Sequence, residues 1–311
     1  MAVTSGERLS ARDAATPSPV ARWLTPVLAA NLAAQIGIVV TGGLVRLTGS
    51  GLGCPSWPQC VPGSYTPVVT QPQGFHKDIE FGNRLLTFVV SVFAIAAFVV
   101  VLRHVRAGFG GRRLFLLGLV PPLGVAVQAV VGGVTVHTDL NPNVVAPHFL
   151  ISMALVAAST ALLLEAGPDG GAEPRAVRPP LRLLAGMLCA VAAVVVVLGT
   201  VVTGSGPHSG DAAKPARLGF DPRTVSWLHA DAVWLFVGLV LALLLALSLT
   251  GDAPRVLRRA WALLAVTLLQ GAIGYTQYAL DLPIALVSLH MLGASLLVVA
   301  VTAAAYPLLT A

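Results

Sequence analysis

Two histidines lie near the start of long apolar segments, where an ionisable side chain is costly and indicates a function. His229 stands in the stretch SWLHAD at 226–231, and His290 ends the stretch VSLH at 287–290. A haem with two axial imidazoles in a four-helix bundle needs one histidine from each of two helices. A metal-ion site usually needs more than two ligands. The pair therefore predicts a bound haem, and the alternative is that each histidine only hydrogen-bonds to a neighbouring helix.

An earlier copy of this pattern lies in the first half of the chain. The motif QAVVGG at Gln128 precedes His148 by 20 residues, as the motif QGAIGY at Gln270 precedes His290 by 20. The motif VVTG at 39–42 recurs at 201–204, and EFGN at 80–83 falls on SWLH at 226–229, so Asn83 takes the place of His229. An even number of helices in each repeat gives the two copies the same orientation, related by an axis along the membrane normal.

The composition indicates an integral membrane protein. Of 311 residues, 56% are hydrophobic and 10% are charged, whereas soluble domains average about 25% charged residues. The basic residues that produce the net charge of +6 fall in short clusters between apolar segments, so we expect no nucleic-acid partner. A helix needs about 20 apolar residues to cross the hydrocarbon layer. Eight segments qualify: 23–45, 80–102, 114–136, 144–164, 182–204, 226–249, 257–278 and 283–308.

These segments predict an all-α integral membrane fold of two pseudo-symmetric four-helix bundles. The expected division is a tail at 1–22, a first bundle at 23–165, a linker at 166–181 and a second bundle at 182–311. Thirteen basic residues fall in the tail and the even-numbered loops, against five in the odd-numbered loops. The excess of basic residues marks the cytoplasmic side. We therefore expect both termini in the cytoplasm and the protein in the cell membrane.

Three cysteines occur in the chain. Cys54 and Cys60 share one polar loop on the side opposite to the termini, and this spacing indicates a disulfide if the loop faces an oxidising compartment. Cys189 lies inside an apolar segment and is expected to be a packing residue.

A carboxylate and two arginines lie near the predicted haem layer. Glu80 precedes Asn83 by three residues and so shares its helical face. A carboxylate beside an open coordination position indicates a reactive site, and the structural alternative is that Glu80 pairs with Arg84 or Arg46. Arg46 and Arg84 could neutralise haem propionates, or they could extend from helix ends to the membrane surface.

The four remaining histidines have weaker functional signals. His104 lies among cytoplasmic arginines and is expected at the surface. Surface or loop roles are favoured for His76, His137 and His208, all on the outer side. His76 precedes Glu80 by four residues and could replace the ligand that is missing at Asn83.

Several segments resemble a known family. They are TGGLVRLTGSGLGCPSWP at 41–58, EFGNR at 80–84, LNP at 140–142 leading to His148, and the histidines His229 and His290. Together they span nearly the whole chain and resemble haem A synthase, which converts haem O into haem A for terminal oxidases. The resemblance is to an actinobacterial-like variant with asparagine in place of one family histidine.

The resemblance implies two pseudo-symmetric four-helix bundles and a role for each. Haem b would bind His229 and His290 in the second bundle, and the substrate haem O would lie near His148 and Glu80 in the first. Cys54 and Cys60 match the outer-loop cysteine pair of the family.

In mechanism, the resemblance implies that the C8 methyl group of haem O is oxidised by successive hydroxylations with oxygen from water. Glu80 would handle protons or stabilise positive charge at the methyl carbon, while His148 holds the substrate iron. Electrons would leave through haem b to an unknown acceptor, and a haem O synthase could hand over the substrate.

Two other classes of protein remain open. A transporter also contains internal repeats, although the polar residues here lie near one face and no apolar segment is clearly broken at its centre. A b-type cytochrome that only transfers electrons would share the histidine pair. Glu80 distinguishes the enzyme from such a cytochrome.

Overall fold

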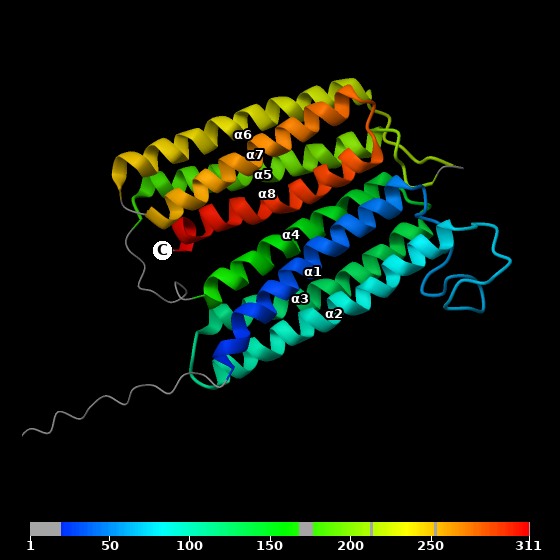
Figure 1. Cartoon of the computed structure of the whole chain (residues 1–311), viewed down its shortest axis with the longest axis horizontal. Coiled ribbons are helices and arrows are strands. Elements are labelled where there is room, and N and C mark those ends of the chain that lie inside the picture. Colours follow the sequence, from blue (N-terminus) through cyan, green and yellow to red (C-terminus); the bar gives the residue numbers. More distant parts are fainter. Residues whose placement is uncertain (1–19, 168–176, 212–213, 252–253, 311) are drawn as a thin grey trace, which may run out of the picture.

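The computed structural model describes residues 20–167, 177–211, 214–251 and 254–310, and within them the chain forms eight helices (Figure 1). Each is long and apolar enough to cross a membrane, so the predicted all-α fold with eight spans is confirmed. Most of the predicted tail and linker, residues 1–19 and 168–176, lies outside the described residues. The helices are α1 (Ala21–Leu47), α2 (His76–Arg106), α3 (Arg112–His137), α4 (Pro142–Ala166), α5 (Pro179–Ser205), α6 (Pro222–Thr250), α7 (Pro254–Ala279) and α8 (Ile284–Thr310).

Most helices extend beyond the apolar segments that predicted them, by up to four residues at an end. The start of α6 shows the reason. Pro222 occupies its first turn, and Asp221 caps the helix by accepting hydrogen bonds from the backbone N–H of Thr224 (2.8 Å) and from the Thr224 hydroxyl (2.7 Å). These hydrogen bonds lower the pKa of the Asp221 carboxyl. Hydropathy predicts only the apolar part of a helix, which lies in the hydrocarbon layer, so it does not include such polar first turns.

The helices pack as two rings of four. In the first, α1 contacts α2 and α4, and α3 closes the ring between them; in the second, α5 contacts α6 and α8, and α7 closes the ring. The two rings can be distinguished in Figure 1, and they contact each other through α1, α4, α5 and α8. Neither α2 and α4 nor α6 and α8 are in contact, so each pair lies diagonally across its ring. The symmetry axis between the rings stays a prediction.

The end of the molecule that carries the loop between α1 and α2, blue to cyan in Figure 1, is here called the disulfide end, and the opposite one the linker end. The buried apolar core of the second ring lies toward the linker end. Its members fall at 181–195, 236–247, 256–263 and 297–308. Most belong to the helix halves near the linker end, whereas Val195 of α5 lies in the half near the disulfide end, where His229 and His290 lie.

The turns that precede α4 and α8 have the same unusual backbone. Asp139 and Leu140 have φ of 50° and 56°, and Asp281 and Leu282 have φ of 57° and 59°. In each turn the leucine N–H closes the preceding helix, bonding to Thr135 O at 2.9 Å or Gln277 O at 2.8 Å. Non-glycine residues in this left-handed region cost about 1–3 kcal/mol each. Both turns are followed eight residues later by a histidine, so they place His148 and His290 at matching positions.

Candidate active site

The second ring places its two predicted haem ligands on opposite helices. His229 lies on α6 and His290 on α8, diagonally across the ring. Each is only partly exposed. Nδ1 of His290 is buried without a hydrogen-bond partner among the described residues, whereas the ring of His229 has the backbone of Val195 on α5 within reach. A buried imidazole nitrogen without a partner is costly in a protein interior. The other ring nitrogen, Nε2, is not among these buried unpartnered atoms, and it is the nitrogen that could bind a metal.

Glycines on the two other helices of the ring lie against these imidazoles. A Cβ atom placed on Gly199 of α5 would lie 3.4 Å from Cε1 of His229, and one on Gly274 of α7 would lie 3.2 Å from Cε1 of His290. The missing side chains let each imidazole pack closely against the neighbouring helix. Two imidazoles on opposite helices of one ring, each held beside a glycine, therefore fit a haem with two histidine ligands.

The glycine beside His229 yields a testable prediction. We expect Gly199→Leu to weaken haem b binding about tenfold or more, because a larger side chain displaces the imidazole, an effect within the range for the loss of a partner around a metal site. Haem retained per protein after purification measures the change. Gly186→Leu on the same helix is the matched control, since no atom lies within 4 Å of a Cβ there. Equal haem loss in both variants would contradict the prediction.

The first ring repeats this arrangement with one ligand changed. A Cβ on Gly132 of α3 would lie 3.4 Å from Cε1 of His148, and Nδ1 of His148 is also buried without a partner among the described residues. On α2, Asn83 lies beside Gly42, and its Oδ1 accepts a 2.8 Å hydrogen bond from the Thr41 hydroxyl. The first ring therefore presents one imidazole and an amide that is already bonded to α1.

The repeated spacing of 20 residues corresponds to a hydrogen bond in both rings. Gln128 donates its amide N–H to the backbone carbonyl of His148 at 2.9 Å, and Gln270 donates to that of His290 at 2.7 Å. Gln128 also contacts Ser152, and Gln270 fills the space above Gly293. The two glutamines therefore fix the helical backbone at the histidines.

We expect Gln270→Ala to weaken haem b binding about fivefold to tenfold, because it removes one hydrogen bond that orients α8 at His290. Gln128→Ala is the matched variant in the first ring and should leave haem b binding unchanged. The measurement is the transfer of haem from the purified protein to a competing globin. If both variants lost haem b at the same rate, the proposed orienting role would be wrong.

Glu80 is buried and held by the disulfide loop. Its Oε2 accepts a hydrogen bond of 2.6 Å from the backbone N–H of Cys54, and its Oε1 pairs with Arg84 at 2.6 Å. Cys54 and Cys60 are bonded to each other, which confirms the predicted pair. A Cβ on Gly53 would overlap the backbone of His76, so only glycine permits this approach of the loop to α2.

The loop also reaches α3. Trp57 packs on Gly133, the residue after the glycine that faces His148, and the carbonyl of Trp57 accepts a hydrogen bond from Nε2 of His137 at 3.0 Å. The disulfide loop therefore joins α2 to α3 at the disulfide end of the first ring. It positions Glu80, and through Trp57 it packs next to the glycine that faces His148.

The two arginines have structural partners. Arg84 bonds to Glu80, to the carbonyl of Cys54 (2.9 Å) and to that of Gln59 (3.3 Å). Arg46 donates to the carbonyls of Thr203 (3.2 Å) and His208 (2.8 Å) in the second half of the chain. Arg84 thus stabilises the loop around Glu80, and Arg46 joins the two rings. A contact of either arginine with haem propionates stays a prediction.

The other histidines take part in local contacts. Nε2 of His208 donates to the carbonyl of Leu282 at 3.0 Å, and Nδ1 of His76 bonds to the Ser50 hydroxyl at 2.8 Å. His104 packs against Phe109 at the linker end. His76, His137 and His208 thus serve loop contacts, as favoured from the sequence, and Nε2 of His76 remains available for another role.

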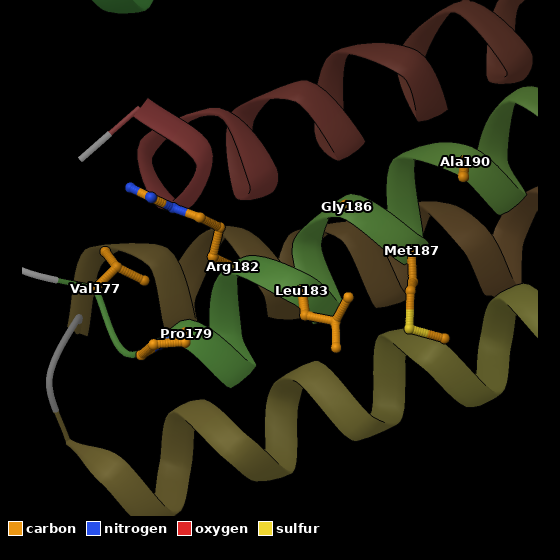
Figure 2. Close-up of a pocket in the computed structure, with 7 residues that line it drawn as sticks. All are labelled: Val177, Pro179, Arg182, Leu183, Gly186, Met187 and Ala190. Atoms are coloured by element: carbon orange, nitrogen blue, oxygen red, sulfur yellow. The ribbon is translucent and has the colours of Figure 1, made fainter.

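A hollow of about 610 Å³ is lined by none of the predicted site residues, and Figure 2 labels the residues that line it. It lies on α5 near the linker end, and Ala190, its residue nearest to Gly199, is about 14 Å from that level along the helix. The lining is apolar apart from one arginine. It consists of Val177, Pro179, Arg182, Leu183, Gly186, Met187 and Ala190. The hollow is therefore separate from the histidine layer.

Several of these site contacts are not predicted from the sequence. The repeated spacing of Gln128 and Gln270 leaves the role of the glutamines open, and Gly132, Gly199 and Gly274 are not predicted as site residues. The recurrence of glycine four residues after each glutamine was the available signal for Gly132 and Gly274. We find no corresponding sequence signal for Gly199, which no such glutamine precedes by four residues.

The fold and this site define a class of protein: an all-helical membrane protein with two four-helix rings, each holding a polar layer with buried histidine near the same end. The chain belongs to the cytochrome oxidase assembly protein family COX15-CtaA, whose family model matches residues 22–302.

Three curated relatives carry the name "Heme A synthase". The chain is 35% identical over 129 residues to the protein of Geobacillus kaustophilus, a match that covers 41% of this chain and 38% of that protein. It is 28% identical over 300 residues to the protein of Methylorubrum extorquens, covering 80% and 77%. It is 29% identical over 316 residues to the protein of a Bradyrhizobium species, covering 86% and 85%. The Geobacillus match thus spans less than half of that relative.

Proposed function

We propose that this protein is a haem A synthase, which oxidises the C8 methyl group of haem O to a formyl group. Family membership and the names of the relatives support this function. The observation that carries it is the unequal chemistry of the two rings. The second ring holds two histidines, whereas the first combines His148 with the buried carboxylate of Glu80. One ring is thereby suited to a permanent haem and the other to a reacting one.

In the second ring, His229 and His290 would hold haem b through their imidazoles, and haem b would supply an electron relay. Gln270 orients the backbone at His290, and the apolar core between this layer and the linker end excludes water from that side. Arg46 and Arg84 lie near the disulfide end and remain our candidates for contact with the haem propionates through donors that their present bonds do not use.

In the first ring, His148 holds the substrate iron and Glu80 acts at the methyl carbon. Each hydroxylation takes one oxygen atom from water and releases two protons and two electrons, and the diol formed after the second loses water to leave the formyl group. The carboxylate accepts a proton or stabilises positive charge at the methyl carbon. Such a group contributes about 10²–10⁴-fold to a rate. The backbone N–H of Cys54 and the guanidinium of Arg84 hold the carboxylate in position before the reaction begins.

Asn83 sets this chain apart from family members with a second histidine in the first ring. Its amide oxygen is engaged by Thr41, and asparagine is a poor ligand for haem iron. We infer that the substrate iron is bound by His148 alone, or by His148 with His76 as a second group. This is the asparagine-containing, actinobacterial-like variant that the sequence resembles.

The protein is proposed to lie in the cell membrane with both termini in the cytoplasm, since thirteen basic residues fall on that side against five on the other. The disulfide of Cys54 and Cys60 then faces the outside, which agrees with an oxidising compartment. The partners in this proposal are haem O, a haem O synthase that hands it over, and an electron acceptor of unknown identity.

The test is expression of the protein with a source of haem O in a host that lacks haem A. Extracted pigments are then separated by chromatography. The proposal expects haem A together with its alcohol intermediate. A purified, folded protein that contains haem b but produces neither pigment would favour a b-type cytochrome. A protein without any haem spectrum would favour a transporter.

A further inference from the structure

One charged residue of the motif around His229 is not used by the proposed function. Asp231 follows His229 by two residues, which is about 200° around the helix. His229 faces Gly199 inside the ring, whereas Asp231 is exposed on the outer face of α6. Asp231 therefore points away from the haem site.

The face that carries Asp231 is otherwise apolar and suited to lipid. It carries the exposed apolar side chains of Trp227, Trp234, Leu235, Leu241 and Leu245. At about 1.5 Å per residue, α6 is about 43 Å long, so it exceeds a hydrocarbon layer of about 30 Å by some 6–7 Å at each end. Asp231 is about 14 Å from the first residue of the helix. With the helix centred in the layer and perpendicular to it, Asp231 would lie about 7 Å inside the hydrocarbon.

No hydrogen bond or ion pair joins Asp231 to another residue in the described part of the chain. An aspartate within a membrane span almost always pairs with another group or faces water, and its short side chain cannot extend to the surface as lysine and arginine do. A cationic partner within the membrane would therefore stabilise the exposed carboxylate on this lipid-facing surface.

The neighbours of Asp231 also favour a cation. Trp227 precedes it by four residues and Trp234 follows it by three, so both indoles flank the carboxylate on the same face. They are 54% and 63% exposed. Tyr275 of α7 accepts a 3.2 Å hydrogen bond from Nε1 of Trp234, which extends this aromatic surface to a second helix. Exposed indole faces attract guanidinium and ammonium groups.

We propose that the face of α6 and α7 formed by Asp231, Trp227, Trp234 and Tyr275 binds a transmembrane helix of another membrane protein. That helix presents an arginine or lysine at the depth of Asp231, nearer the disulfide end. A second copy of this chain fits less well. A two-fold contact through this face would bring the two Asp231 carboxylates to the same depth, where like charges repel.

The test uses the full-length protein with a donor fluorophore at its N-terminus, in vesicles, with acceptor-labelled leucine–alanine helices as probes. One probe carries a single arginine about 7 Å inside the hydrocarbon, and the matched probe carries leucine there. We expect energy transfer to indicate about fivefold tighter binding of the arginine probe, the scale of a polar contact between membrane helices. Asp231→Asn should abolish the preference, and Leu235→Ala on the same face should retain it.

Circular dichroism melting curves of the variants establish that they are folded, and a second fluorophore pair reports self-association of the protein. The proposal is overturned if the unaltered protein does not distinguish the two probes, or if Asp231→Asn still does. It is also overturned if Asp231→Asn instead abolishes self-association, because the surface would then serve a second copy. None of these results depends on haem A production, so the proposed function can fail or succeed separately.

Discussion

The His290→Ala variant is expected to bind haem b at least about 100-fold more weakly than the unaltered protein. The change removes an axial ligand, and the loss of a mere outer-shell partner at a metal site already costs about 10- to 100-fold. Alanine at this position also leaves a space beside Gly274, which the imidazole ring now fills. The measurement is the haem content per protein together with the absorption spectrum of the reduced form.

Two controls make this result specific to the layer of His229 and His290. His104→Ala removes a histidine at the linker end and should leave the haem content unchanged. His148→Ala removes the histidine of the first ring and should lower haem A production while haem b is retained. Added imidazole should partly restore the spectrum of His290→Ala by entering the vacated space. A folded His290→Ala protein with its full haem content would refute the ligand assignment.

The Glu80→Gln variant is expected to produce haem A at least about 100-fold more slowly, with an unchanged content of haem b. A positioned carboxylate that handles protons or stabilises developing charge contributes about 10²–10⁴-fold, and glutamine has nearly the same shape without the charge. Chromatography of extracted pigments measures both the haem A and the alcohol intermediate. An unchanged rate of haem A production would refute the catalytic role of Glu80.

Glu80 also holds the disulfide loop, so its chemical role must be separated from its structural one. Arg84→Gln breaks the same ion pair but keeps the carboxylate and its bond from Cys54. If Glu80 were only structural, the two variants should lose the same activity and loosen the loop equally. A catalytic carboxylate predicts that Glu80→Gln loses far more. The rate at which a thiol reagent labels Cys54 and Cys60 after mild reduction reports the state of the loop.

Some contacts in the two rings follow from residues close together in the chain, and others depend on the tertiary structure. The spacing of 20 residues between Gln128 and His148 and between Gln270 and His290 is visible in the sequence, since both members of each pair lie near one helical hairpin. Their hydrogen bonds follow directly from that hairpin geometry. By contrast, Arg46 bonds to Thr203 and His208, more than 150 residues away in the chain. No local pattern identifies such a partner.

From the sequence, the structural partner expected for Glu80 is either Arg84 or Arg46. In the structure the partner is Arg84, one helical turn away. The hydrogen bond from Cys54 was not foreseen, because it requires the path of the loop and the close approach at Gly53. The carboxylate thus has a structural role in every case, and the proposed chemical role is additional.

By itself, the sequence determined the eight membrane spans, the disulfide pair and the histidines that carry the proposed chemistry. These depend on the length of apolar segments and on residue types, which are local properties. Only the tertiary structure decided that His229 and His290 lie diagonally across one ring, that glycines of other helices face their imidazoles, and that Arg46 joins the rings. Such features depend on how helices pack side by side, and helix packing is set by contacts between residues far apart in the chain.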